Sequence, residues 1–319
     1  MQTSMPTACV QCNATKLTRK EEKWGYTLYE CAACKLQFWW PFKNPGHESY
    51  EQSGRYRDRN FHPQTKSLYH SQILFLKKPV KPETALLDLG MGTGRFLSAA
   101  KEKGYRVTGT DFEKDAIVAA QTVFKLDDVY DLDLESFFKK FPERKFDIIT
   151  MFEVLEHVDG YSFFPYIKDA LKPGGYFAVT VPNRDCWKPL LAHEGPPIHL
   201  TRWSREAIEI FLNGYGFKVV SIKRLPIPLR LLISYFNDWT KGILSFSTLK
   251  RVEKLIQKEP VAISKPGPRR ISPLMRVLRA LSFVKLYILF TIPATILYVY
   301  IWATGGRNYT TLYVTAVPK

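Results

Sequence analysis

The sequence predicts an α/β fold built on a mostly parallel sheet of seven strands with helices on both faces. Between residues 84 and 225, short apolar runs alternate with helical patterns, which is typical of parallel strands joined by crossover helices. The first apolar run leads into the turn Gly90-Met91-Gly92-Thr93-Gly94, where a ligand can approach the backbone at the start of a helix. These features predict a Rossmann-like sheet. We also expect an N-terminal zinc ribbon and a helical insertion between the last two strands.

The elements of this sheet can be placed one by one. The first strand is expected at 84–89, between two prolines and the glycine turn. Further elements follow as a strand at 105–110, a helix at 114–123, strands at 129–130 and 146–151, a helix at 161–171 that stops at Pro173-Gly174-Gly175, a strand at 176–181, a helix at 204–212 and a strand at 218–222. The seventh strand should come next, but its alternating pattern arrives only at 311–317. A structureless loop of that length would be implausible, so the insertion should be helical.

Composition and charge exclude several classes of protein. With 45% hydrophobic and 14% aromatic residues, the 319-residue chain is neither disordered nor collagen-like. The net charge of +16 sits in the flanks, because residues 1–80 carry 12 basic and 6 acidic side chains, residues 81–224 carry 20 and 21, and residues 225–319 carry 14 and 3. A neutral central block argues against a nucleic-acid partner. The N-terminus lacks the pattern of a secretory signal, so we expect a cytoplasmic protein.

Two cysteine pairs in the first 34 residues predict a metal site. Cys9 and Cys12, and then Cys31 and Cys34, are each separated by two residues, a spacing that lets four thiolates complete a tetrahedral zinc site. All four coordination positions would be filled, which indicates structural rather than catalytic zinc, and metal binding would supply folding energy to a module with little core. The alternative is four free cysteines that share this spacing by chance. A redox pair is disfavoured because no βαβ pattern surrounds either motif.

The central block resembles the class I S-adenosylmethionine-dependent methyltransferases. The resemblance is carried by 86–94 with Asp111, by 146–157 and by 171–183. The cysteine ribbon and the motif at 199–204 are similar to a bacterial subgroup associated with polysaccharide, lipid or cofactor biosynthesis. The early third glycine of the turn departs from the dinucleotide fingerprint and counts against NAD. The resemblance therefore implies an enzyme that uses S-adenosylmethionine.

The family implies roles for particular residues of this chain. Its pattern would place Asp111 at the cofactor ribose and either Asp131 or Asp133 at the adenine amino group; the sequence leaves that choice open. Residues that would line the methionine moiety or flank the pocket are Asp88, Gly90, Gly92, Gly94, Met151 and Phe152.

Two histidines are candidate catalytic bases for a hydroxyl acceptor. His157 follows the fourth strand at the edge where ligands bind in such sheets, within a stretch that resembles ubiquinone-type O-methyltransferases, in which the corresponding histidine is the usual candidate. It could equally cap or pack the following helix. His199 lies after the fifth strand on a loop that should face the same pocket, and His193 has weaker support. Glu153 and Glu156 are interpreted as loop architecture and helix capping.

The insertion has the pattern of a membrane-surface segment. Between Lys241 and Lys285 there are eleven basic and two acidic residues, and the 21 residues of 286–306 carry no charge. As a helix this uncharged run would measure about 30 Å, and the neighbouring cations would favour anionic lipid. The sixth and seventh strands share one sheet, so the segment must return to the side it left, by re-entry, by pairing with a second span or by lying in the interface. The alternative is a soluble lid or dimer face.

The expected organisation is a zinc ribbon at 1–45, a helical and aromatic connector at 46–83, an S-adenosylmethionine-binding core at 84–225, a basic and apolar insertion at 226–307 and the last core strand at 308–319. We expect methyl transfer to an oxygen of a lipid-linked or glycan-related small substrate, by a protein held peripherally or monotopically on the inner membrane face. The alternatives are a soluble sugar or natural-product C- or N-methyltransferase and a cofactor-binding scaffold in a membrane biosynthetic complex.

Overall fold

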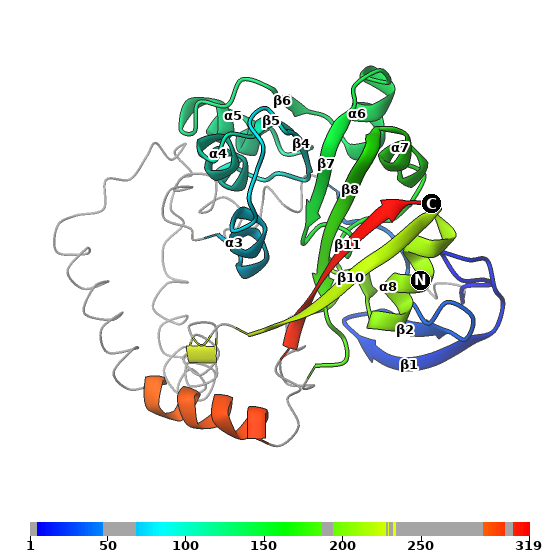
Figure 1. Ribbon diagram of the computed structural model, residues 1–319. Coiled ribbons are helices and arrows are strands. Elements are labelled where there is room, and N and C mark those ends of the chain that lie inside the picture. The colour runs from blue at the N-terminus through cyan, green and yellow to red at the C-terminus, as the bar shows by residue number, and fades with distance from the viewer. Residues whose placement is uncertain are drawn as a thin grey trace, which may run out of the picture. The chain divides into compact units, whose positions relative to one another are not determined.

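The computed structural model describes residues 5–46, 68–186, 194–227, 290–303 and 309–319, together with residues 229, 232 and 233 (Figure 1). The chain divides into two compact units, one of Met1–Pro226 with Tyr309–Lys319 and one of Ile227–Asn308. Most of the predicted connector and the basic segment at 241–285 lie outside the described residues, as does His193.

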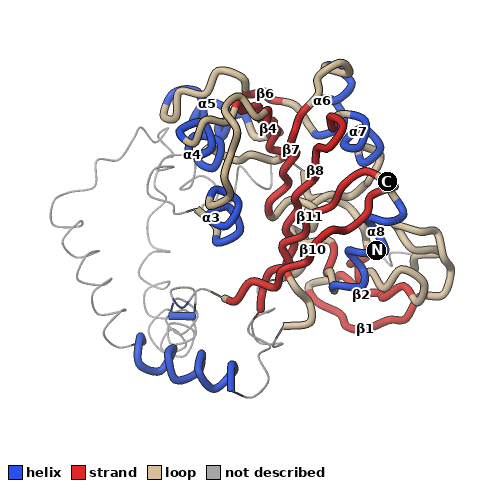
Figure 2. Tube along the Cα trace, viewed as in Figure 1, coloured by secondary structure: helices blue, strands red, loops and turns tan. Residues whose placement is uncertain are grey.

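A seven-stranded sheet forms the centre of the first unit (Figure 2). Its strands are β4 (Ala85–Leu89), β5 (Arg106–Asp111), β6 (Val129–Asp131), β7 (Phe146–Phe152), β8 (Leu171–Pro182), β10 (Phe217–Pro226) and β11 (Tyr309–Pro318). Their order is β10-β11-β8-β7-β4-β5-β6, and only β11 runs against the other six. The predicted mostly parallel, Rossmann-like sheet is therefore confirmed, with β10 and β11 paired directly although the insertion separates them in sequence.

Helices cover both faces of this sheet. They are α3 (His70–Leu76), α4 (Arg95–Glu102), α5 (Lys114–Thr122), α6 (Leu134–Lys140), α7 (Phe164–Asp169) and α8 (Arg205–Gly214). The apolar sides of α3, α4 and α5 pack in one core cluster with Leu86, while those of α6, α7 and α8 pack in another with Leu87. Neighbouring residues of a strand point to opposite faces, so these two leucines mark the two layers.

The connection from α7 to β8 differs from the prediction. The helix expected to reach residue 171 ends at Asp169, and β8 already begins at Leu171, opposite Phe146. The pairing of β7 with β8 shifts register before Ile148, and within the shift Gly174 has a φ of +78°. The glycines at 174 and 175 thus bend a strand that has already started.

The ribbon is a second sheet that includes a strand from the core. It comprises β1 (Leu17–Lys23), β2 (Tyr26–Cys31), β3 (Gln37–Trp40) and β9 (Thr201–Arg202), in that order. Strand β9 pairs antiparallel with β3, and the Trp39 amide donates to the Leu200 carbonyl at 2.9 Å. The ribbon is therefore joined by backbone hydrogen bonds to the segment that follows His199.

The second unit contains a helix over residues 290–303, inside the uncharged run noted in the sequence. Its exposed apolar side chains include Ile292, Ile296, Val299 and Trp302. None of the helices that the structure describes combines the length and the apolarity needed to cross a bilayer.

Candidate active site

A cavity of about 440 Å³ opens at the carboxyl ends of β4, β5, β6 and β7. In sheets of this type, ligands bind at that edge. Among the predicted site residues, Gly90, Gly92, Asp111, Asp133 and His157 line the cavity. Its lining does not include the other predicted ones, namely Asp88, Gly94, Asp131, Met151, Phe152 and His199.

The glycine turn is shaped for close approach of a ligand. Gly90 has a φ of +71°, and a Cβ there would lie 2.5 Å from Cγ2 of Val154. Gly92 has a φ of +55° and nothing within 4 Å of such a Cβ, so its backbone borders open space. The amides of Gly90 and Met91 donate to the Thr110 carbonyl at 2.9 and 3.1 Å, which fixes the turn against β5.

Asp111 ends β5 and is held by two backbone amides. Oδ2 accepts from Gly92 at 2.8 Å and Oδ1 from Glu113 at 3.0 Å. The side chain is buried and still borders the cavity. The turn and this carboxylate thus form a cradle of the kind that a nucleoside with a ribose diol and an amino-acid tail requires, and the residues fit S-adenosylmethionine.

Asp88 lies in β4, just before the turn, and does not line the cavity. It is buried, and Thr150 Oγ1 donates to its Oδ1 at 2.6 Å. Burial raises its pKa to about 7, with Thr150 opposing the shift and Asp111 adding to it. Gly94 precedes α4 and packs against Ala120 and Leu126, and both Met151 and Phe152 are buried in the core. All four residues are buried and lie outside the cavity lining.

The structure separates the two aspartates proposed for the adenine. Asp131 ends β6 with an exposed side chain. Asp133 caps α6 by accepting from the Ser136 amide at 2.9 Å, and it also borders the cavity. Of the two, Asp133 is therefore the one that borders the cavity.

The two candidate bases meet edge to face. The rings of His157 and His199 have centroids 4.5 Å apart at 88°. Nδ1 of His157 donates to the Ile198 carbonyl at 3.0 Å, and Nδ1 of His199 bonds the Glu194 carboxylate. Each ring is thus held through Nδ1, and Nε2 of His157 lies 3.8 Å from Oε1 of Glu156.

Two glutamates beside these histidines were not recognised from the sequence as part of the site. Glu156 is fully buried, and its backbone carbonyl accepts from the Leu200 amide at 2.7 Å. Burial raises its pKa well above the usual range, and nearby Glu153 adds to the shift. Glu194 follows a stretch with no regular pattern, so nothing in the sequence signalled its bond to His199.

Asn44, at the end of the ribbon, also reaches the cavity. Its Nδ2 donates to the His157 carbonyl at 2.8 Å, and its amide donates to Asp159 Oδ2 at 3.0 Å. A polar residue between Lys43 and Pro45 gives no periodic signal, so only the fold reveals that the ribbon contributes to this wall.

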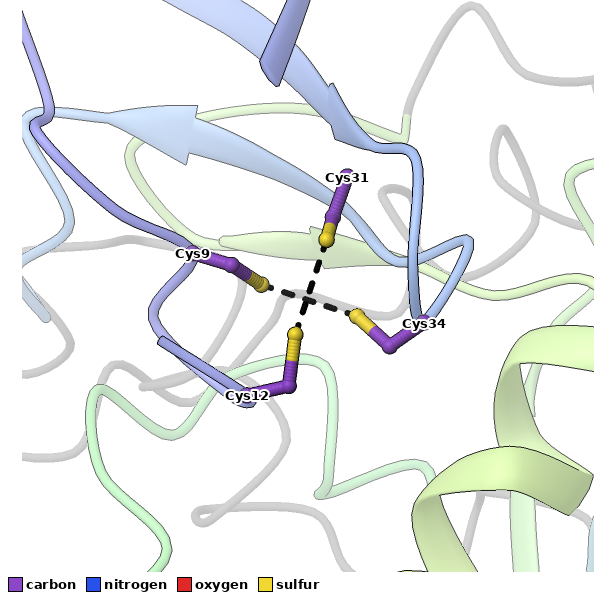
Figure 3. A group of neighbouring side chains, drawn as sticks. All are labelled: Cys9, Cys12, Cys31 and Cys34. Carbon is purple, nitrogen blue, oxygen red and sulfur yellow. Dashed lines mark hydrogen bonds between the residues drawn. The ribbon is translucent and has the colours of Figure 1, made fainter. Parts of the chain in front are cut away.

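The four predicted metal ligands converge in the ribbon. Figure 3 shows the sulfurs of Cys9, Cys12, Cys31 and Cys34 pointing at one centre. The Sγ atoms of Cys9 and Cys34 are 3.5 Å apart, as are those of Cys12 and Cys31. Four thiol sulfurs around a common point fit a tetrahedral zinc ion.

Comparison with known proteins gives consistent matches. A family model described as a methyltransferase domain matches residues 61–222, about half of the chain. A probable S-adenosylmethionine-dependent methyltransferase of Mycolicibacterium smegmatis is 25% identical over 135 residues, which are 42% of this chain and 52% of that protein. A ubiquinone biosynthesis O-methyltransferase of Idiomarina loihiensis is 32% identical over 122 residues, or 36% of this chain and 46% of the relative.

The cyclopropane synthase MmaA2 of Mycobacterium tuberculosis is a structural neighbour with 15% identity and a TM-score of 0.48, over 86% of this chain and 99% of that one. The chain spans about half the length of the curated relatives it matches. The match of the family model falls on the glycine turn, Asp111 and the strands around the cavity. On that evidence, the chain belongs to the methyltransferase domain family.

Proposed function

We propose that this protein transfers a methyl group from S-adenosylmethionine to an oxygen of a small acceptor. The observation that carries the proposal is the cavity at the glycine turn, bordered by Asp111 and by His157. The cofactor supplies a methyl group already activated on a sulfonium, so the protein has to orient the acceptor and promote loss of its proton.

We assign the residues of the cradle to different parts of the cofactor. The open backbone at Gly92 receives the amino-acid end of the cofactor, and Asp111 accepts hydrogen bonds from the ribose hydroxyls. Asp133 borders the same cavity and is our choice for the adenine side. Asp88 does not line the cavity and bonds Thr150, so we assign it no contact with the cofactor.

The acceptor is activated by the two histidines. Transfer forms an oxygen–methyl bond and breaks the sulfur–methyl bond, whose electron pair stays on sulfur, while the acceptor hydroxyl gives up its proton. His157 borders the cavity and is our choice for the base that takes this proton, while His199 contacts the His157 ring edge to face and acts by positioning it. Such assistance contributes about 10²–10⁴ in rate.

For the acceptor we propose a lipid-linked or glycan-related molecule at the cytoplasmic face of a membrane. The support comes from the exposed Ile292, Ile296 and Trp302 on the helix at 290–303 and from the cationic sequence that precedes it. Basic residues beside apolar ones favour an anionic lipid surface. The relatives named for ubiquinone biosynthesis act in the making of a lipid-soluble molecule, which is consistent with this choice.

Calorimetric titration tests the proposal that the protein binds S-adenosylmethionine. We expect binding to the wild type and weaker binding to Asp111→Asn, with Asp127→Asn, an exposed carboxylate after α5, as the matched control. A wild type that binds no S-adenosylmethionine would overturn the proposal. His157→Gln with unchanged cellular function would favour a scaffold.

Co-sedimentation with vesicles tests the proposal that the protein binds an anionic membrane surface. Vesicles with and without anionic lipid are compared for the wild type, for a chain in which a short linker replaces residues 241–306, and for Ile296→Asp. We expect the wild type alone to bind anionic vesicles strongly, and all three to keep cofactor binding. A wild type that stays in solution would overturn the membrane proposal. It would favour a soluble sugar acceptor, with transfer to carbon or nitrogen among the possible reactions.

A further inference from the structure

Three side chains beside the cavity bring potential metal ligands together outside the cysteine ribbon. One donor atom from each of Glu156, His157 and His199 lies within 4.8 Å of the other two. His157 borders the cavity, and its Nε2 is 3.8 Å from Glu156 Oε1. We propose that these three residues form a second metal site, for a divalent first-row transition-metal ion.

The burial of Glu156, together with the lack of hydrogen bonds to its carboxylate, is an independent observation that points to a ligand. Its side chain has no solvent exposure, and within the described part of the chain neither carboxylate oxygen has a hydrogen-bond partner. A buried carboxylate without hydrogen bonds is costly, and such groups are normally paired with a charge or coordinated to a metal. A cation between Glu156 and the two imidazoles supplies both the opposite charge and the missing contacts.

The surroundings of the histidines are those of metal ligands. The Nδ1 atoms of His157 and His199 are held by the Ile198 carbonyl and the Glu194 carboxylate, respectively. Metal-binding histidines commonly donate their second ring nitrogen to a carbonyl or carboxylate, which fixes the tautomer and the ring orientation. The Leu200 amide further ties the loop of His199 to the Glu156 carbonyl. The ligands therefore sit on backbone that is already fixed.

The donor set selects the class of ion. Two imidazole nitrogens and one carboxylate suit zinc, iron(II), manganese or cobalt, whereas magnesium and calcium prefer an all-oxygen shell. Three protein ligands leave coordination positions open, as in catalytic rather than structural sites. The site is thus chemically distinct from the four thiolates of the ribbon.

The role of this ion rests on the proposed function. At the cavity edge, an ion held by His157, His199 and Glu156 would polarise the acceptor hydroxyl and make loss of its proton easier. The two histidines then act on the acceptor through the metal they hold.

The test uses the full chain with zinc retained in the ribbon and titrates it with manganese(II), followed by calorimetry and by loss of the free-ion electron paramagnetic resonance signal. We expect one equivalent to bind the wild type. Glu156→Gln and His199→Asn should each weaken binding at least about 100-fold, and Glu194→Ala, which removes the carboxylate bonded to His199 Nδ1, about 10–100-fold. Zinc content reports whether the ribbon stays intact in every variant.

Matched controls are His70→Gln and Glu206→Gln, which change an exposed histidine on α3 and an exposed glutamate on α8. Both should bind manganese(II) as the wild type does. No binding by the wild type, or equal binding by Glu156→Gln, His199→Asn and the wild type, would overturn the site. Because S-adenosylmethionine binding is measured on the same samples, a metal-free protein that still binds it leaves the proposed function standing. A protein that binds manganese(II) but not S-adenosylmethionine would support the metal site and overturn the proposed function.

Discussion

Nη1 of Arg202 lies 3.0 Å from Oε1 of Glu21, so one ion pair joins the first strand of the ribbon to the strand that follows His199. The same guanidinium donates through Nη2 to the Glu194 carbonyl at 2.8 Å and lies 5.0 Å from the Trp39 ring centroid. The Glu194 carboxylate in turn bonds His199. Arg202 therefore connects the ribbon with the candidate site.

Arg202→Gln should lower both stability and turnover. The variant loses a charge-assisted hydrogen bond to the Glu194 carbonyl, worth about 1.5–3 kcal/mol, together with the packing on Trp39. Since Glu194 positions His199, turnover should fall while S-adenosylmethionine affinity stays within about twofold, because the cradle does not involve Arg202. Urea denaturation, calorimetry and initial rates measure the three effects.

Glu21→Gln separates the ion pair from the other contacts of Arg202. The Glu21 side chain is 47% exposed, and pairs of that kind contribute about 0–1 kcal/mol. We therefore expect the smaller loss of stability from this variant and no loss of turnover. Equal losses from both variants would contradict the assigned role of the Glu194 carbonyl.

The zinc ion that we propose at the four cysteines should support catalysis from a distance. In Cys12→Ser the metal site is incomplete, so β3 should lose order, and with it the pairing of Phe38 with Thr201 that holds β9. We expect loss of zinc and at least about a tenfold fall in turnover, with S-adenosylmethionine still bound. Metal analysis, rate measurements and calorimetry check these outcomes.

Cys186→Ala is the control, because Cys186 is a buried cysteine outside the cluster. It should keep its zinc and its turnover. A zinc-free Cys12→Ser protein with wild-type turnover would show that the ribbon does not position the site.

The parallel core could be predicted because its strands are contiguous apolar runs with clear stops. Leu86 and Leu87 are buried on opposite faces, which explains why the run has no alternation, and Asp111 marks the end of the next strand. The cysteine spacing was equally direct, because two pairs of this spacing can bring four sulfurs to one point, and the structure shows that convergence. Both features can be predicted because each depends on a pattern within a short stretch of sequence.

The contacts between ribbon and core could not be predicted in this way. Strand β9 is only Thr201–Arg202, too short for any periodicity, and it exists because the ribbon edge lies beside it. The burial of Glu156 has no local signal either, because a glutamate before a histidine at the start of a helix fits a cap just as well. Both features depend on segments far apart in sequence.

Gly90→Ala should destabilise the protein and weaken S-adenosylmethionine binding. The new Cβ would lie 2.5 Å from Val154 Cγ2, at a residue whose φ is +71°. Backbone strain of that kind costs about 1–3 kcal/mol, and relief of the clash would displace the turn that borders the cavity. Denaturation and calorimetric titration measure the two losses.

Two comparisons isolate the clash. Gly104→Ala carries similar backbone strain at a φ of +95° but has nothing within 4 Å of the new Cβ, so it should lose stability without losing cofactor affinity. Combining Gly90→Ala with Val154→Ala removes the contacted methyl groups and should restore part of the affinity. A double variant no better than Gly90→Ala would place the damage in the backbone conformation alone.

Asp88 should make the stability of the cofactor-free protein depend on pH. Burial raises its pKa from 3.8 to about 7. Its contribution to stability is complete below pH 4 and is lost as the pH rises through 7, because the unfolded chain releases a proton that the folded protein holds. The difference of about three pH units corresponds to at most about 4 kcal/mol.

Asp88→Asn removes this dependence, because the amide is neutral at every pH and keeps an oxygen that can accept from Thr150. Relative to the wild type, the variant should therefore gain up to about 4 kcal/mol between pH 4 and pH 8. Urea denaturation at a series of pH values measures the gain, with the exposed Asp127→Asn as the variant whose profile should follow the wild type. If Asp88→Asn also follows the wild type at every pH, Asp88 is ionised in the folded protein and is stabilised by a partner other than Thr150.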